Sequence, residues 1–163
     1  MNQQPTVYLE TTIPSYLTSR SSNNLILAGE QEATHQWWQT RKDCFNVFIS
    51  NLVIQEITKG DVFAAQRRLE VCEGISLLEI DDEAIHLTQV LLDSGLFPPK
   101  ASTDAGHIAV AARHSMDYLL TWNCKHIANA EIIRKLNLVI YQAGYYVPFI
   151  CTPLELFGGE QYE

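Results

Sequence analysis

Four polar residues stand where apolar stretches of the chain end or where helices begin. Glu10 closes the first β-prone run, and Asn123 lies just after a later, nearly all-apolar run. Glu56 falls in a helical stretch that follows a second run, and Asp104 falls in the first turn of another expected helix. Ligands of open parallel sheets bind beyond the carboxyl ends of the strands, so these side chains are the first candidates for one site. Such a site would be acidic, and a bound divalent metal would reverse its local charge.

Each of these residues also has a purely structural interpretation when it is taken alone. Asp104 would gain from the helix dipole at a helix N-terminus, Glu56 would be a solvated helix residue, and Asn123 is a common turn former. Glu10 is harder to explain in this way, because glutamate is depleted in strands. His107 lies three residues after Asp104 on the same helix flank, where it can serve packing or support the site. The conjunction of the four residues therefore carries more weight than any one of them.

The elements that would position these residues alternate between strands and helices. Short apolar runs between turn residues indicate strands, and apolar residues at helical spacing indicate helices. The alternation predicts the α/β class, as a three-layer α/β/α fold with a mostly parallel sheet. The predicted strands are residues 6–10, 44–49, 75–80, 118–121 and 138–141. The predicted helices start at residues 11–15, span 24–42, 51–59, 61–73, 82–94 and 128–135, and include one capped by Ser102 or Thr103.

Length and composition predict one soluble globular domain. The chain has 163 residues, of which 47% are hydrophobic and 18% charged. We expect a single domain over residues 1–163, with a core at about 6–156 and an acidic, peripheral C-terminal tail at 152–163. The net charge of −8 argues against broad attraction to nucleic acid but leaves a localised site open.

Several other classes of site and location are disfavoured by missing patterns. The cysteines form no C-x-x-C pair, so they read as free thiols of a cytoplasmic protein rather than as zinc ligands or a disulfide framework. The histidines lack the H-E-x-x-H spacing of zinc hydrolases, and no glycine-rich nucleotide-binding motif is present. No signal peptide and no membrane-spanning segment is expected.

Four sequence blocks together resemble the motifs of the PIN-domain family, in particular VapC-like toxins of type II toxin–antitoxin systems. These blocks are VYLETTIPSYL, SNLVIQEITKGD, STDAGHIAVAA and DYLLTWNCKHIANA. The resemblance covers most of the chain and implies a three-layer α/β/α fold and a metal-dependent ribonuclease. The family's acidic positions map onto Glu10, Glu56, Asp104 and Asn123. The first and fourth positions are usually Asp, so the chain is similar to a subgroup that carries Glu and Asn there.

The resemblance implies a magnesium or manganese site made by Glu10, Glu56 and Asp104. Both ions prefer hard oxygen ligands, usually one or two carboxylates with waters and a substrate phosphate. The ion would polarise the phosphate and lower the pKa of a bound water. Asn123, as the fourth catalytic residue, would hold water or substrate. Three further residues are candidates for supporting the ligands, namely Thr11, His107 and Thr121.

The function that follows is that of a Mg²⁺- or Mn²⁺-dependent endoribonuclease, the toxin of a type II pair. Its expected partners are an RNA substrate, a cognate antitoxin protein and a second copy of the chain in a homodimer. The alternative is a catalytically weak PIN-like module that binds RNA or protein without cleaving it. The neutral Asn123 and the net charge favour the alternative, whereas three carboxylates in the expected order favour the enzyme.

Overall fold

A parallel sheet of five strands forms the centre of the molecule. The structure is a computed structural model and describes residues 3–159. The strand order is β3-β2-β1-β4-β5, and every neighbouring pair is parallel, so all carboxyl ends lie at one edge. The strands are β1 (Thr6–Leu9), β2 (Asn46–Ser50), β3 (Ser76–Leu78), β4 (Tyr118–Leu120) and β5 (Phe149–Cys151).

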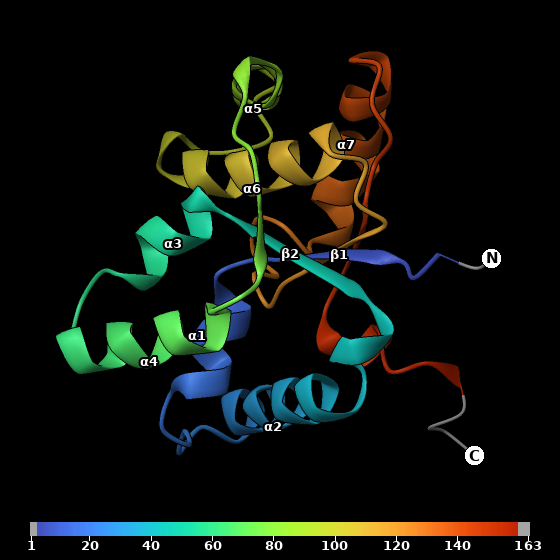
Figure 1. The fold of residues 1–163 in the computed structure, drawn as a ribbon. Helices are drawn as coiled ribbons and strands as arrows, with labels where there is room; N and C mark the ends of the chain where they lie inside the picture. The colour runs from blue at the N-terminus through green and yellow to red at the C-terminus, as the bar shows by residue number, and fades with distance from the viewer. Residues whose placement is uncertain (1–2, 160–163) are drawn as a thin grey trace.

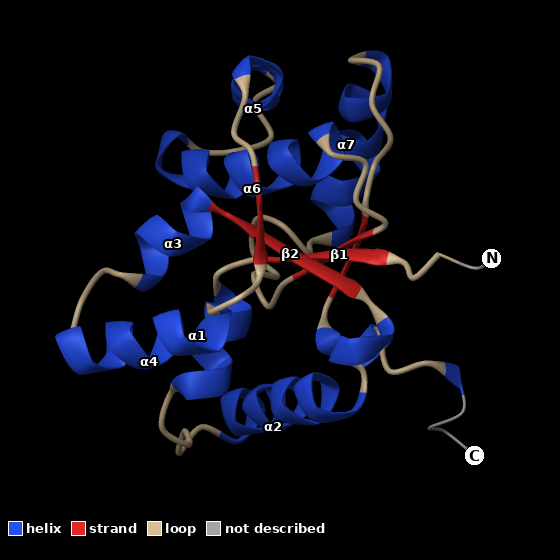
Figure 2. Ribbon diagram, in the orientation of Figure 1, coloured by secondary structure: helices blue, strands red, loops and turns tan. Residues whose placement is uncertain are grey.

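Helices cover both faces of this sheet (Figure 1). The lower face in that view carries α1 (Thr12–Thr18), α2 (Leu25–Thr40) and α4 (Val62–Cys72). The upper face carries α5 (Asp82–Asp93), α6 (Ser102–Arg113) and α7 (Ala130–Gln142). The short helix α3 (Asn51–Ile57) continues from the end of β2, at the carboxyl edge (Figure 2). The predicted three-layer α/β/α fold is therefore confirmed.

The central strands are apolar because both faces of the sheet are covered. Tyr8 and Leu9 of β1 and Leu119 and Leu120 of β4 are buried. On α6, a run of small residues lets the helix approach its neighbours closely. A Cβ added at Gly106 would lie only 2.9 Å from Cδ1 of Leu52 on α3. The small residues of α6 thus bring this helix against α3, the element that carries Glu56.

Side-chain caps define where the helices that follow loops begin. The side chain of Ser50 accepts a hydrogen bond from Leu52 N and so caps α3 at the end of β2. Comparable caps begin α2, α4, α5 and α7 and are made by Asn24, Asp61, Asp81 and Asn129. The expected cap of α6 by Ser102 or Thr103 is wrong. Ala101 holds that position after a 3₁₀ turn, and Ser102 is the first helical residue.

Two predictions near the C-terminus are also wrong. Residues 138–141 are not a strand but the last turns of α7, which is longer than the predicted helix at 128–135. The fifth strand is β5, which the sequence pattern did not indicate. The segment after it is not peripheral, because Leu156 and Phe157 are buried and Glu155 completes a capping box with Thr152. Residues 160–163 of the predicted tail lie outside the described residues. Within residues 3–159, no helix is both long and apolar enough to cross a membrane.

Candidate functional site

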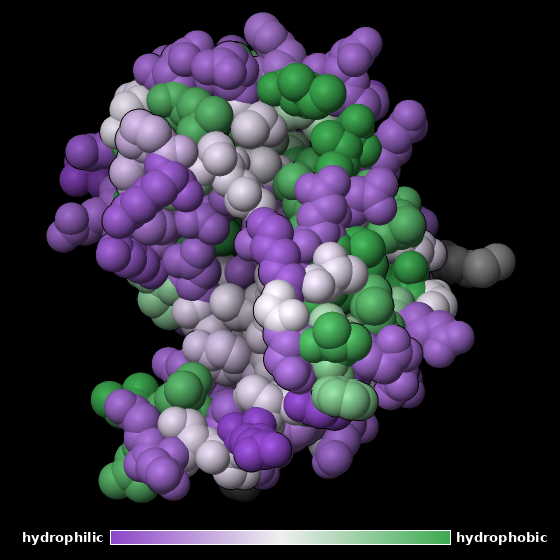
Figure 3. Space-filling model, turned by 90° about the vertical axis from the view of Figure 1, so that its left-hand side faces the viewer, coloured by the Kyte–Doolittle hydropathy of each residue, from purple (hydrophilic) through white to green (hydrophobic). Residues whose placement is uncertain are grey.

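The carboxyl edge of the sheet holds Glu10, the residue that follows β1. Its side chain is almost completely buried, with 4% of the residue exposed. Oε2 accepts hydrogen bonds from the backbone N–H of Thr12 at 2.8 Å, from Thr12 Oγ1 at 2.8 Å and from Thr121 Oγ1 at 3.1 Å. Thr121 follows β4, the strand next to β1, so the ends of two neighbouring strands fix this carboxylate. Figure 3 faces this edge and shows a hollow between an upper and a lower lobe.

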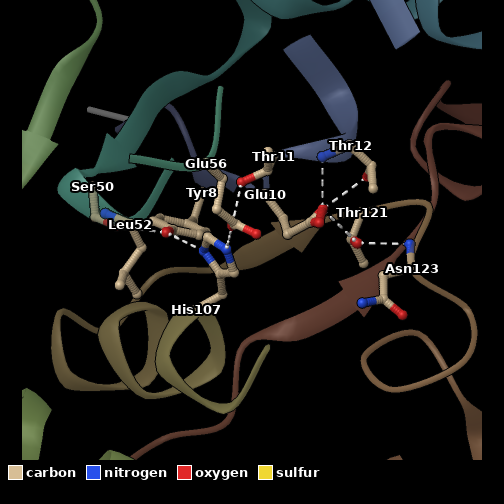
Figure 4. A network of polar contacts seen from close by, with 10 residues as sticks. All are labelled: Tyr8, Glu10, Thr11, Thr12, Ser50, Leu52, Glu56, His107, Thr121 and Asn123. Atoms are coloured by element: carbon tan, nitrogen blue, oxygen red, sulfur yellow. Dashed lines mark hydrogen bonds and ion pairs between the residues drawn. The ribbon is translucent and has the colours of Figure 1, made fainter. Parts of the chain in front are cut away.

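Glu56 approaches the same edge from α3. Its Oε1 accepts a hydrogen bond from Thr11 Oγ1 at 2.7 Å and lies 2.6 Å from Nε2 of His107 on α6. Figure 4 shows the other carboxylate oxygen turned toward Glu10, and no described residue bonds to it. Two consecutive residues after β1 therefore tie the two carboxylates, since Thr11 holds Glu56 and Thr12, the first residue of α1, holds Glu10.

The two carboxyl groups differ in how readily they ionise. Burial raises the pKa of Glu10 above its usual range, although His107 and the hydrogen bonds from Thr12 and Thr121 act to lower it. Burial also acts to raise the pKa of Glu56, but hydrogen bonds from His107 and Thr11 outweigh it, so the pKa of Glu56 is lowered. The ionised form of Glu56 is thus stabilised by its hydrogen bonds, whereas the hydrogen bonds of Glu10 do not compensate for the burial of its charge.

Asp104 and Asn123 are joined through His126. Asp104 Oδ2 lies 2.9 Å from His126 Nδ1, and Asn123 Oδ1 accepts a hydrogen bond from His126 N at 3.0 Å. The backbone N–H of Asn123 donates to Thr121 Oγ1 at 2.9 Å, and the same hydroxyl donates to Glu10. A continuous polar chain therefore runs from Glu10 to Asp104. Within it, Asn123 also fills the turn-forming role that its residue type suggests.

The donor set suits a magnesium or manganese ion held by two carboxylates. Glu10 and Glu56 both offer hard oxygen ligands, and one or two carboxylates with several waters is a usual Mg²⁺ site. The poorly compensated charge of the buried Glu10 is also what a cation would neutralise. Among residues 3–159, however, no three His, Cys, Asp or Glu side chains are gathered closely enough to hold one ion. A place for Asp104 as third ligand therefore remains a prediction.

Sequence reasoning missed four contributors to this edge. Thr12 holds Glu10, and His126, in the turn after β4, pairs with Asp104. Tyr8 and Ser50 lie behind the site, where their hydroxyls and the ring of His107 form one chain of hydrogen bonds. The available signal was a tyrosine between apolar residues of the first β-prone run, since a buried phenol usually needs a partner. Its partners come from β2 and α6, far away along the chain.

Comparison with known proteins identifies the fold. No protein-family model matches the chain, and no curated protein sequence does. A crystal structure of VapBC2 from Rickettsia felis, bound to a DNA fragment from the promoter, is similar with a TM-score of 0.58 and 13% sequence identity. The alignment covers 90% of this chain and 97% of that one, so it spans the whole domain. The chain therefore has a PIN-like α/β/α fold of the kind seen in VapBC2.

Proposed function

We propose that this protein is a metal-dependent endoribonuclease, the toxin of a type II toxin–antitoxin pair. The observation that carries the proposal is the pair of carboxylates, Glu10 and Glu56, held at the carboxyl edge of a PIN-like sheet. Each has an oxygen that is tied by hydroxyl or backbone donors and a second oxygen that accepts none of these bonds. This arrangement offers two pre-oriented ligand atoms at the place where open parallel sheets bind their ligands.

Glu10 and Glu56 would hold Mg²⁺ or Mn²⁺, with Asp104 as the third carboxylate. When bound, the ion supplies electrostatic stabilisation of the phosphodiester and a more acidic water. The chain's own residues then have distinct tasks. Thr11, Thr12 and Thr121 orient the two glutamates, and the carboxamide of Asn123 presents a neutral donor to water or to a phosphate oxygen.

Removal of divalent metal is expected to abolish RNA cleavage. Purified protein should cleave defined RNAs in Mg²⁺ or Mn²⁺, lose this activity in excess EDTA, and regain it when Mg²⁺ is added beyond the chelator. Gel analysis of end-labelled RNA measures the products. Cleavage that persists in EDTA, or an absence of cleavage with either metal across a panel of transfer, ribosomal and messenger RNAs, contradicts the proposal.

A binding module without catalysis is the second candidate function. Asn123 favours it because a carboxamide carries no negative charge, and Asp104 favours it because its Oδ2 is already engaged by His126 Nδ1. Such a module would bind RNA equally well in EDTA and in Mg²⁺ and leave it uncut. Binding and cleavage measured on the same labelled RNA therefore separate the two functions.

We further propose that an antitoxin segment covers the acidic edge and that the toxin forms a homodimer. An Arg or Lys of that segment would pair with Glu10 and Glu56 in place of the metal. The expected result is a dimer in sedimentation at micromolar concentration, and loss of cleavage when the antitoxin encoded beside the gene is added. A monomer contradicts the homodimer, and undiminished cleavage in the complex contradicts the covering of the site.

A further inference from the structure

A chain of buried polar groups lies behind Glu56, inside the core of the molecule. Ser50 and Tyr8 are fully buried and His107 is 1% exposed. Ser50 Oγ lies 2.7 Å from Tyr8 Oη, Tyr8 Oη lies 2.7 Å from His107 Nδ1, and His107 Nε2 lies 2.6 Å from Glu56 Oε1 (Figure 4). Polar groups in a core are costly unless each is bonded, so a chain of this length needs an explanation beyond packing.

The donors and acceptors available on these four side chains assign one direction to this series of hydrogen bonds. An ionised carboxylate only accepts, so Nε2 of His107 must donate to Glu56. With a neutral ring, Nδ1 then accepts from the hydroxyl of Tyr8, whose oxygen accepts in turn from Ser50. Ser50 Oγ accepts from Leu52 N, so each donor and each acceptor along the chain is used. The reverse direction would leave the proton of Ser50 without a hydrogen-bond acceptor among the described residues.

Both ends of this series of hydrogen bonds lie on the helix that carries Glu56. Ser50 is the N-cap of α3, and Glu56 lies near the other end of that helix. An isolated helix of seven residues would be marginal in water, so its placement depends on tertiary contacts. The polar chain ties both ends of α3 to β1 through Tyr8 and to α6 through His107. The position of the Glu56 carboxylate relative to Glu10 is thereby fixed from two sides.

We propose that Tyr8, Ser50 and His107 are positioning residues that hold the Glu56 carboxylate in its metal-binding orientation. The inference rests on the proposed function, because it assigns these residues a task in the same metal site. His107 acts on Glu56 directly, whereas Tyr8 and Ser50 act through the ring of His107 by keeping it in one tautomer and one orientation. Outer hydrogen bonds of this kind orient ligands in metal sites generally.

The tautomer of His107 is the first test, and it needs neither metal nor RNA. Two-dimensional ¹⁵N NMR of the full chain without metal should show a protonated Nε2 and an unprotonated Nδ1. Tyr8→Phe should perturb the His107 nitrogen signals, whereas Tyr118→Phe should leave them unchanged. Tyr118 is the matched control, since it lies on the neighbouring strand β4 and no described residue bonds to its hydroxyl. A His107 ring with a protonated Nδ1 and an unprotonated Nε2 overturns the proposal.

Metal affinity is the second test. In titrations with Mn²⁺ alone, His107→Leu should weaken binding by about 10- to 100-fold, the range seen for outer hydrogen bonds. His107→Gln, which can still donate to Glu56, should recover most of the loss. Tyr8→Phe should weaken binding by up to about 10-fold, and Tyr118→Phe should not change it. Thermal unfolding verifies that each variant is folded.

The outcomes separate this inference from the proposed function. If the wild-type chain binds no Mn²⁺, the proposed function fails, and the positioning role fails with it. If the wild type binds Mn²⁺ and folded His107→Leu binds it equally well, only the positioning role is overturned. Equal weakening by folded His107→Leu and His107→Gln also overturns it, because the donor to Glu56 would then be irrelevant.

Discussion

Glu10→Gln is expected to abolish Mn²⁺ binding and RNA cleavage and at the same time to stabilise the metal-free protein. The substitution keeps the volume of the side chain and an oxygen that can accept from Thr12 and Thr121, but it removes the charge. Because burial opposes ionisation of Glu10, the neutral amide avoids that cost. The thermal midpoint should rise by about 2–4 °C for each kcal/mol relieved in a domain of this size.

The stabilisation should depend on pH in a defined direction. A raised native pKa means that the folded protein holds the proton of Glu10 more tightly than the unfolded chain does. The contribution of Glu10 to the free energy of unfolding is then retained at low pH and decreases as pH rises above the ordinary glutamate value of about 4.3. The advantage of the Gln variant should therefore be small in acid and larger near neutral pH.

Thermal and urea unfolding in EDTA, repeated across this pH range, measure the effect. Glu79→Gln is the matched control, because Glu79 is exposed and its change should alter neither stability nor metal binding. A Glu10→Gln protein that is less stable than the wild type at neutral pH contradicts the account of burial given for this carboxyl. A variant that binds Mn²⁺ normally contradicts the role of Glu10 as a ligand.

Asp104→Asn should abolish cleavage as well, but with the opposite effect on stability. Asp104 lies in the first turn of α6, where a carboxylate interacts favourably with the helix dipole, and its Oδ2 lies 2.9 Å from His126 Nδ1. Loss of that charge should lower the free energy of unfolding by up to about 1 kcal/mol. Cleavage should fall by about 100-fold or more, the scale on which preorganised charged groups contribute to catalysis.

Asp82→Asn separates the effect of the helix dipole from the effect on the site. Asp82 also stands in the first turn of a helix, α5, so the variant should show a comparable small loss of stability with full cleavage. Rates of RNA cleavage and urea unfolding curves for both variants provide the comparison. If Asp104→Asn cleaves RNA at the wild-type rate, Asp104 has no part in catalysis and its pairing with His126 is structural.

Which residues lie at the carboxyl edge of the sheet could be predicted from the sequence, whereas the hydrogen bonds between their side chains could not. Strand ends are visible as apolar runs, so Glu10, Glu56 and Asn123 could be placed at one edge once a parallel sheet was expected. Local spacing also placed His107 beside Asp104 on α6. Which side chains bond across elements depends on register and helix packing. The contact of His107 with Glu56 rather than Asp104 therefore required the structure.

The wrong secondary-structure predictions at α7 and β5 have a local cause. Residues 138–141 form a short apolar run, and such a run is ambiguous between a strand and a buried helix segment. In α7, Leu136 and Ile140 form one buried face at helical spacing, and burial of this face favours a helix over a strand for residues 138–141. The real fifth strand has only three residues, begins directly after Pro148 and has an exposed Phe149, so its pattern is too short to stand out.

Both outer strands of the sheet are only three residues long, and this brevity affects how copies of the molecule meet at high concentration. The borders of the sheet, β3 and β5, carry the exposed apolar side chains Leu77 and Phe149. Long apolar edge strands are templates for aggregation, because a foreign chain can pair along them. Here such a chain would gain only a few backbone hydrogen bonds. Extension of the sheet by strand pairing between copies is therefore disfavoured.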